Sequence, residues 1–206
     1  MKLIIENFRK FVINENSKID TLIIYDFDET LGKVQNDFVE FIDKSGNVVK
    51  SIEPGDYDGY QKFYSINKKL IGKEIFFKSP QLKQVIEKYG KQITPYDSVV
   101  NQMKNDIKKP NCHVIVLTAR PKEDVKILKQ VIHQDFKVPE INNNIFGVGG
   151  MGNVKGNFLV KLLNNFPNVE NIIVYDDKQK NLDGIKNSLS SEKKYNFDLN
   201  LVKHKK

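Results

Sequence analysis

Short runs of consecutive apolar residues recur along the chain, with little polar alternation inside them. They occupy residues 21–25, 113–117, 144–148 and 171–175, with a weaker run at 197–202. Such runs are typical of strands covered on both faces, because neither side of the strand then needs polar residues. The pattern therefore predicts a parallel sheet that lies between layers of helices.

Helical patterns over about residues 94–108, 121–134 and 156–165 separate these runs. Thr94 followed by Pro95 fits an N-cap and the first position of a helix. Alternation of strands and helices along the chain predicts an α/β fold with three layers and right-handed crossovers.

Two parts of the chain stand outside this alternation. Residues 32–79 read as an insertion after the first strand, and the apolar runs 38–42 and 48–52 within it predict a β-hairpin. Residues 1–18 form a separate segment whose apolar side chains share one helical face. We therefore expect an N-terminal amphipathic segment over 1–18 and one domain over 19–206.

Aromatic residues alternate with five lysines over residues 57–78 of the insertion. Aromatic side chains between cations can stack nucleic-acid bases beside a groove that binds phosphate. The same residues can instead form the core of a small subdomain. Both interpretations stay open on the sequence alone.

Composition restricts the setting of the protein. No window approaches the roughly 18 apolar residues of a membrane span, and the first residues lack the features of a secretory signal. A single cysteine, Cys112, predicts a reducing, cytoplasmic setting, and three histidines are too few and too scattered for a zinc cluster. The net charge of +7 suits a nucleic-acid partner, although lysine is abundant throughout the chain.

Residues that can do chemistry directly follow three of the predicted strands. They are Asp26, Asp28, Thr118, Ala119, Arg120, Asp176 and Asp177. Because the carboxyl ends of parallel strands meet at one edge of a sheet, we expect these side chains to lie close together. Four converging carboxylates need a neutralising cation, and hard oxygen ligands favour Mg²⁺. The sequence therefore predicts a magnesium site that also binds a phosphorylated substrate.

Each group has a chemical use at such a site. Asp26 can attack phosphorus as a nucleophile, and Asp28 can protonate the leaving oxygen and later activate water. The carbonyl of Phe27, which lies between them, can lend an oxygen to the metal. Thr118 and the next backbone N–H, that of Ala119, can bind the phosphoryl oxygens.

Two basic residues add to this set. Lys155 lies just before a helical run and contributes positive charge where a helix start already favours anions. Arg120 has two possible roles, which the sequence leaves equally open. It can contact a second phosphate of the substrate or cap the helix that follows it.

These residues resemble the motifs of the haloacid dehalogenase (HAD) superfamily. The segment Asp-Phe-Asp-Glu-Thr-Leu at 26–31 resembles its motif I, residues 113–118 its motif II, Lys155 its motif III, and residues 174–177 its motif IV. The motifs occur in the order that the family uses and span roughly residues 19–185. The resemblance implies a Rossmann-like parallel sheet, with the 32–79 insertion as a small cap.

The resemblance also implies a phosphatase mechanism for these residues. It makes Asp26 the nucleophile and Asp28 the acid/base, with Thr118 and Lys155 binding the substrate phosphate. It assigns the acidic metal site to Asp176 and Asp177, one or both as direct ligands, together with Asp26. Asp28 joins the metal site through its backbone carbonyl.

The motifs further resemble those of the RNA-repair-like branch and its polynucleotide 3′-phosphatases, with Ala119, Val154 and Lys178 as departures. A polynucleotide end is therefore one substrate class, and a nucleotide or small phosphometabolite is the other. A non-catalytic role also stays open, because residues 1–15 resemble peptides that sort proteins into phage proheads. Oligomeric state cannot be inferred from the sequence.

Overall fold

The computed structural model describes residues 19–34, 39–53, 56–78, 82–89, 93–141, 143–191 and 195–204. The predicted amphipathic segment over 1–18 lies outside the described residues. The described chain forms two compact units, and each is considered by itself. The first holds the chain up to Gly32 and from Pro95 onward, and the second runs from Lys33 to Thr94.

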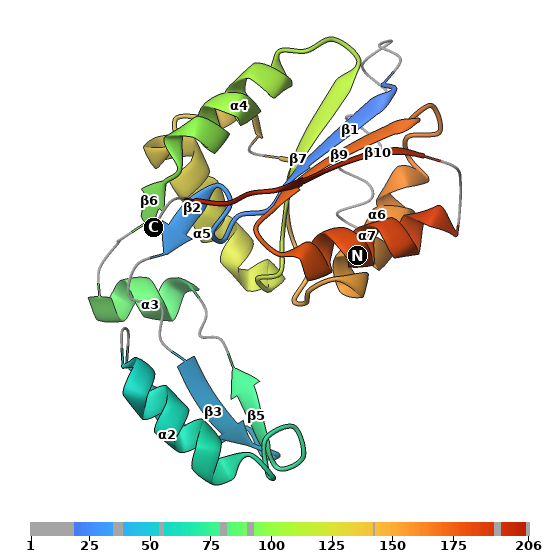
Figure 1. The fold of residues 1–206 in the computed structure, drawn as a ribbon. Coiled ribbons are helices and arrows are strands. Elements are labelled where there is room, and N and C mark those ends of the chain that lie inside the picture. The colour runs from blue at the N-terminus through green and yellow to red at the C-terminus, as the bar shows by residue number, and fades with distance from the viewer. Residues whose placement is uncertain are drawn as a thin grey trace. The chain divides into compact units, whose positions relative to one another are not determined.

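The first unit is built on a five-stranded parallel sheet (Figure 1). Its order is β10-β9-β1-β7-β8. The strands are β1 (Thr21–Tyr25), β7 (Cys112–Thr118), β8 (Ile145–Gly147), β9 (Asn171–Asp176) and β10 (Asn196–Leu201). Each predicted apolar run is one of these strands, so the structure confirms the three-layer α/β fold.

Helices cover both faces of the sheet, as the buried strands require. Figure 1 shows α6 (Asn153–Leu163) and α7 (Gln179–Ser190) on one side, and α4 (Asp97–Ile107) and α5 (Val125–Gln130) on the other. The core on the first side joins Leu22 and Ile24 of β1 to apolar residues of α6 and α7. All three central residues of β1 are at most 1% exposed, which explains the absence of polar alternation there.

The chain between β7 and β8 is less regular than the single predicted helix over 121–134. A short 3₁₀ turn, η1 (Lys122–Asp124), leads into α5, and a π-helical turn, η2 (Val131–Asp135), extends it. A second 3₁₀ turn, η3 (Pro139–Ile141), precedes β8.

The predicted helix start at Thr94 is wrong. Pro95 ends a short strand, β6 (Ile93–Pro95), which pairs with β2 (Gly32–Val34). Pro95 favours an extended conformation at Thr94, and pairing with β2 extends the backbone further. Helix α4 therefore begins at Asp97.

The second unit is a three-stranded antiparallel sheet with two helices. The strands lie in the order β4-β3-β5. They are β3 (Val39–Asp43), β4 (Val48–Ile52) and β5 (Ile75–Lys78), and the helices are α2 (Tyr57–Asn67) and α3 (Leu82–Tyr89). The pairing of β3 with β4 confirms the predicted hairpin. Helix α2 begins where the Asp56 carboxylate accepts the N–H of Gly59 at 2.9 Å.

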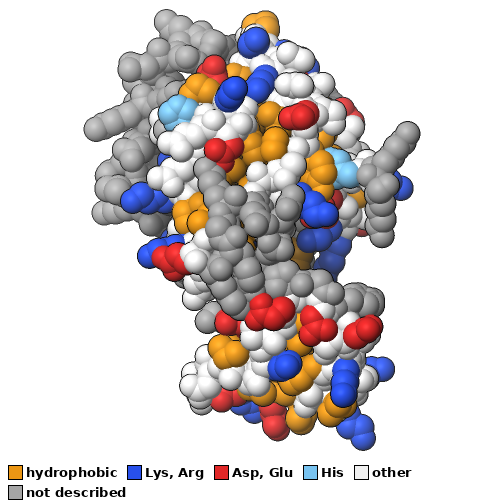
Figure 2. All heavy atoms as spheres, turned by 90° about the vertical axis from the view of Figure 1, so that its left-hand side faces the viewer, with side chains coloured by type: hydrophobic (Ala, Val, Ile, Leu, Met, Phe, Trp, Pro, Cys, Tyr) orange, Lys and Arg blue, Asp and Glu red, His pale blue; other side chains and the backbone are white. Residues whose placement is uncertain are grey.

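Aromatic residues share the core of this second unit with buried Ile52 and Ile75. The ring of fully buried Phe41 lies 4.5 Å from that of Phe63 and 6.0 Å from that of Tyr60. Tyr60 and Phe63 therefore pack inward, as the subdomain interpretation of the aromatic residues requires. Figure 2 shows hydrophobic and lysine side chains side by side on one face of this unit. Among the side chains of this unit that the structure describes, the exposed large apolar ones are Val48, Val49, Ile66, Leu70 and Phe76.

Among the described residues, no helix combines the length and the apolar character needed to cross a membrane.

Candidate active site

The register of the parallel strands brings the predicted acidic residues together. Tyr25 of β1 lies opposite Tyr175 of β9 and Val116 of β7. Asp26 and Asp176 each follow one residue later, and the N–H of Asp26 donates to the carbonyl of Tyr175 at 2.9 Å. Thr118 ends β7 on the other side of β1. Residues distant in sequence thus meet at the carboxyl edge of the sheet.

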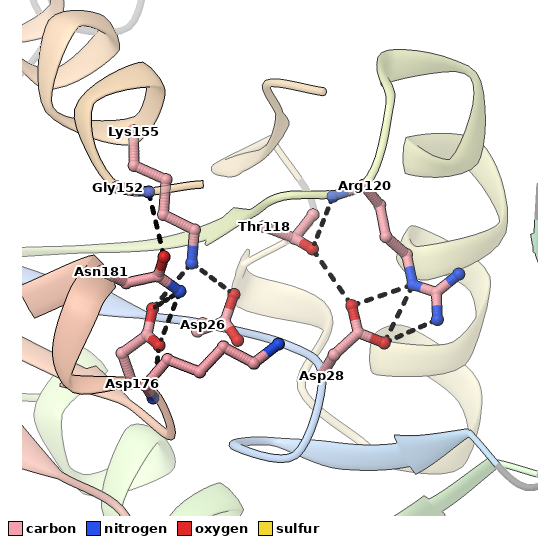
Figure 3. A network of polar contacts seen from close by, with 9 residues as sticks. Asp26, Asp28, Thr118, Arg120, Gly152, Lys155, Asp176 and Asn181 are labelled. Atoms are coloured by element: carbon pink, nitrogen blue, oxygen red, sulfur yellow. Dashed lines mark hydrogen bonds and ion pairs between the residues drawn. The ribbon is translucent and has the colours of Figure 1, made fainter. Parts of the chain in front are cut away.

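Lys155 joins two of these carboxylates (Figure 3). Its Nζ donates to Asp26 Oδ1 at 2.6 Å and to Asp176 Oδ2 at 2.7 Å. The side chain is 1% exposed and comes from the first turn of α6. Burying an ammonium group is costly unless carboxylates pair with it. The bridge therefore explains how a lysine can lie inside this fold.

Close packing of α6 on α7 delivers Lys155 to this place. A Cβ at Gly156 would meet the carbonyl oxygen of Gly184 at 2.9 Å, and a Cβ at Gly184 would meet the Cα of Gly152 at 2.6 Å. Only glycine permits the two helices to approach so closely without a shift. Helix α6 begins at Asn153, directly after Gly152, whose φ of 54° also suits glycine.

Burial governs the protonation of the two central groups. Burial raises the pKa of Asp26 to about 7, and the nearby charges of Asp176 and Asp28 add to this effect, whereas Lys155 opposes it. For Lys155, burial alone would lower the pKa, but the carboxylates of Asp26 and Asp176 outweigh burial and raise it. A single lysine thus only partly compensates the negative charge at this edge.

The acidic residues fit a divalent cation. Carboxylate oxygens of Asp26, Asp176 and Asp177 lie within 4.8 Å of one another. Asp177 Oδ1 is buried and has no hydrogen-bond partner among the described residues. Carboxylate oxygens are hard ligands of the kind that Mg²⁺ prefers, and the negative charge of this group is only partly neutralised by Lys155.

The carboxylate of Asp28 lies apart from this acidic group and pairs with Arg120. The guanidinium contacts both carboxylate oxygens, at 2.6 to 3.0 Å, and Thr118 Oγ1 lies 3.4 Å from Asp28 Oδ2. The backbone N–H of Arg120 donates to Thr118 Oγ1 at 3.1 Å, across the intervening Ala119. Arg120 Nη1 also lies 3.7 Å from the buried carboxylate of Asp124.

The carbonyl of Phe27 serves a different purpose from the one expected. It accepts the N–H groups of Leu31 and Gly32, both at 3.0 Å, and that of Thr30 at 3.3 Å. These bonds close the turn after β1 and fill the acceptor capacity of the oxygen. They leave the carbonyl of Asp28 as the better backbone candidate for the metal.

A comparison with known protein families matches residues 77–205, more than half of the chain, to "HAD domain family 1 in Swiss Army Knife RNA repair proteins". The chain belongs to this HAD family. The resemblance inferred from the motifs is therefore confirmed, and the family supports a hydrolase or phosphatase type of function. No curated protein and no solved structure matches the chain.

The matched part of this HAD domain begins after the segment that carries Asp26 and Asp28. It contains Thr118, Lys155 and Asp176, which the structure brings to the same edge of the sheet as Asp26. Sheet geometry thus joins the first motif to the part that the family comparison covers.

Asn181 is a site residue that the sequence did not reveal. Its amide nitrogen donates to both carboxylate oxygens of Asp176, at 2.9 and 3.1 Å, and its Oδ1 accepts the N–H of Gly152 at 3.0 Å. Asn181 is 2% exposed and lies in the first turn of α7. A polar residue on the buried face of a helix that directly follows two aspartates is the signal that could have identified it.

Proposed function

We propose that this HAD domain is a Mg²⁺-dependent phosphatase that forms an aspartyl-phosphate on Asp26 and acts on a polynucleotide end. The observation that carries the proposal is the bridge from Lys155 to Asp26 and Asp176, with Asp28 and Thr118 at the same edge. In this arrangement Asp26 would serve as the nucleophile, Asp28 as the proton donor and Lys155 as the fixed positive charge.

The reaction needs two steps from these residues. In the first, Asp26 attacks phosphorus, the bond to the ester oxygen breaks, and Asp28 gives that oxygen a proton. In the second, Asp28 takes a proton from water as the water oxygen attacks phosphorus. Inorganic phosphate leaves and the carboxylate of Asp26 is restored. Lys155 and the hydroxyl of Thr118 stabilise the charge on the phosphoryl oxygens.

The carboxylates of Asp26, Asp176 and Asp177 would hold Mg²⁺, with the carbonyl of Asp28 as a further ligand. When bound, the ion supplies positive charge to the phosphoryl oxygens during transfer. Asn181, Lys155 and the N–H of Lys178 hold the carboxylate of Asp176 in place from three directions.

Two observations support a polynucleotide end over a small phosphate ester. The family description names RNA repair proteins, and the chain carries a net charge of +7. Arg120 adds a structural reason, because the phosphodiester next to a terminal phosphate offers its guanidinium a second anion. Binding that anion would loosen the pair between Arg120 and Asp28, so that Asp28 can carry the proton that it gives to the leaving oxygen. We place this activity in the cytoplasm, in keeping with the single cysteine.

A phosphate-release assay tests the proposal. The purified chain is incubated with p-nitrophenyl phosphate, nucleoside monophosphates, and DNA and RNA oligonucleotides that carry a 3′-phosphate. We expect Mg²⁺-dependent release that EDTA stops and added Mg²⁺ restores, with the highest kcat/KM on an oligonucleotide. Highest efficiency on a nucleoside monophosphate would replace the polynucleotide by a small substrate, and no release from any compound would reject the phosphatase.

Two variants connect that activity to the site. Asp26→Asn should lower kcat by at least about 10³-fold, because an amide cannot form the acyl phosphate. Asp20→Asn is the matched control, since Asp20 lies one residue before β1, at the opposite end of the strand, and should leave kcat unchanged. Wild-type activity in Asp26→Asn would remove Asp26 from the nucleophile role.

A further inference from the structure

The turn that follows Asp28 has an unusual backbone at Glu29. The φ of Glu29 is 56°, in the left-handed region that residues other than glycine, asparagine and aspartate seldom adopt. The turn is closed by the N–H groups that converge on the Phe27 carbonyl, and the N–H of Glu29 donates to the carbonyl of Gly32 at 3.0 Å. Strained conformations persist where surrounding contacts determine them, so the contacts of Glu29 are informative.

Two aromatic residues hold Glu29 from outside the turn. The hydroxyl of Tyr96 donates to Glu29 Oε2 at 2.5 Å, and Nε2 of His204 lies 3.0 Å from the Glu29 carbonyl oxygen. A carbonyl oxygen can only accept, so Nε2 of His204 carries the proton. The rings of Tyr96 and His204 stack with centroids 3.3 Å apart and planes 4° from parallel.

These two residues reach the turn from distant parts of the same compact unit. Tyr96 lies between β6 and α4, and its N–H also donates to the carbonyl of Leu31 at 2.9 Å. His204 follows β10, the edge strand, which Figure 1 shows running toward the C-terminal label. Neither ring belongs to the buried core of the sheet. Their contacts therefore fix the turn and contribute little to the core.

Burial and the hydrogen bond to Glu29 raise the pKa of Tyr96 to about 12. The hydroxyl thus remains a donor throughout the physiological range. The Glu29 backbone is held through its side chain by Tyr96 and through its carbonyl by His204.

We propose that Glu29, Tyr96 and His204 form a clamp that positions Asp28 for proton transfer to the leaving group. The proposal rests on the phosphatase function proposed above. Arg120 and Thr118 fix the carboxylate of Asp28, whereas the clamp fixes the backbone of the next residue. Release of the clamp lets Glu29 relax to a negative φ and displaces Asp28 relative to Asp26. The three members of the clamp are positioning residues, because they act through Asp28.

Leaving-group dependence separates this role from a general structural one. The p-nitrophenolate group leaves without much help from an acid, whereas the alkoxide of a 3′-phosphorylated oligonucleotide needs a proton. Tyr96→Phe and His204→Phe keep the stacked rings and remove the two donors. We expect kcat on the oligonucleotide to fall about 10- to 100-fold in each, and kcat on p-nitrophenyl phosphate to fall less than about 3-fold. Equal losses on the two substrates, or no loss, would overturn the clamp.

Matched controls come from residues of the same types elsewhere in the unit. Tyr195→Phe and His133→Phe should leave both activities unchanged. Glu29→Ala and Glu29→Gly form a second pair, because both remove the carboxylate and only glycine accepts a positive φ without strain. Glu29→Gly should therefore lose less activity on the oligonucleotide than Glu29→Ala. Equal losses would contradict the part of the clamp that depends on φ.

Amide hydrogen exchange tests the clamp independently of catalytic activity. In Tyr96→Phe and His204→Phe, the amides of Leu31 and Gly32 should exchange about 10-fold faster than in the wild type, and not in the controls. Unchanged exchange would overturn the clamp even if the enzyme is active. If the wild-type chain hydrolyses neither substrate, the proposed function fails, and the exchange rates alone decide whether the clamp holds the turn.

Discussion

The candidate site consists of two halves that are held in different ways. The lysine half contains Asp26, Lys155, Asp176 and Asn181, all at most 5% exposed. The arginine half contains Asp28, Thr118, Arg120 and Asp124, of which the last three are buried and only the carboxylate of Asp28 is partly exposed, at 29%. A strand edge and two closely packed helices fix the lysine half. The arginine half sits at the turn after β1 and at the segment that leads from β7 into η1.

This difference suggests that the lysine half contributes mainly to the stability of the fold, whereas the pair of Arg120 with Asp28 can rearrange when a substrate binds. Buried charges that pair with one another are costly to disturb, because loss of one partner leaves the others unpaired in a medium of low polarity. A partly exposed pair can exchange one partner for another at little cost. We therefore expect changes in the lysine half to affect the free energy of unfolding, and changes in the arginine half to affect turnover.

The largest expected effect comes from Lys155→Met. The variant leaves Asp26 and Asp176 buried without their shared cation, so the free energy of unfolding should fall by about 3–5 kcal/mol. Urea-induced unfolding followed by circular dichroism, without Mg²⁺, measures the change. Lys161→Met on the exposed side of α6 is the control and should change it by less than about 0.5 kcal/mol. A similarly small loss in Lys155→Met would contradict the division into two halves.

His113, which belongs to neither half, should make the free energy of unfolding depend on pH. Burial lowers the pKa of His113 from 6.5 to about 4. Between these values the unfolded chain binds more protons than the folded one, so stability is lost as pH falls from about 6.5 to about 4. The loss amounts to about 3 kcal/mol by pH 4, and it should be absent in His113→Phe. Urea titrations at pH 7, 5.5 and 4 give the free energy of unfolding of the two proteins at each pH. An equal loss of this free energy on acidification in both proteins would exclude His113 as the cause.

Asn181→Ala should weaken the lysine half without removing a charge. Asp176 loses both hydrogen bonds from the amide nitrogen of Asn181, which should lower the free energy of unfolding by about 2 kcal/mol. The Mg²⁺ concentration for half-maximal phosphate release should rise about 10-fold, because the carboxylate is no longer held in place. Asn187→Ala, an exposed change on the same helix, provides the control. An unaltered Mg²⁺ requirement would remove Asn181 from the support of the metal ligands.

The smallest expected effect on stability is that of Arg120→Lys. Lysine keeps the positive charge and loses the planar fork that contacts both oxygens of Asp28. We expect a change of less than about 1 kcal/mol in the free energy of unfolding, with kcat on a 3′-phosphorylated oligonucleotide about 10-fold lower. Lys126→Arg on α5 controls for surface charge. A stability loss as large as that of Lys155→Met would show that both halves are equally rigid.

The parts of the fold that the sequence predicted are those determined by local pattern. The strand at 21–25 matches β1 because unbroken apolar residues leave few alternatives to a strand buried on both faces. The predicted start of α4 is wrong because Thr94 followed by Pro95 fits a helix start as well as a strand end, and the pairing of β6 with β2, a contact between distant residues, selects the strand. The insertion is predicted over residues 32–79, and the compact unit of the structure runs from Lys33 to Thr94. The extent of the insertion as a cap stays a prediction.

The site divides in the same way. The approach of Asp26 and Asp176 follows from chain order and sheet topology, so spacing alone placed them together. The partners of Arg120 and Asn181 depend on side-chain directions, which the sequence does not contain. For Arg120 the sequence left two roles open, and the structure adds the pair with Asp28. The sequence does not distinguish Asn181 from a helix cap, because asparagine near a helix start is usually a cap.

The two glycines between α6 and α7 have a consequence for engineering this centre. The position of the buried ammonium group of Lys155 depends on the absence of a side chain at Gly156 and Gly184, because a Cβ at either position would push the helices apart. A methyl group added at either glycine would therefore move Lys155 away from the carboxylates without altering any charged residue. The electric field at Asp26, the proposed nucleophile, can therefore be tuned by helix spacing, with every polar side chain of the site left as it is.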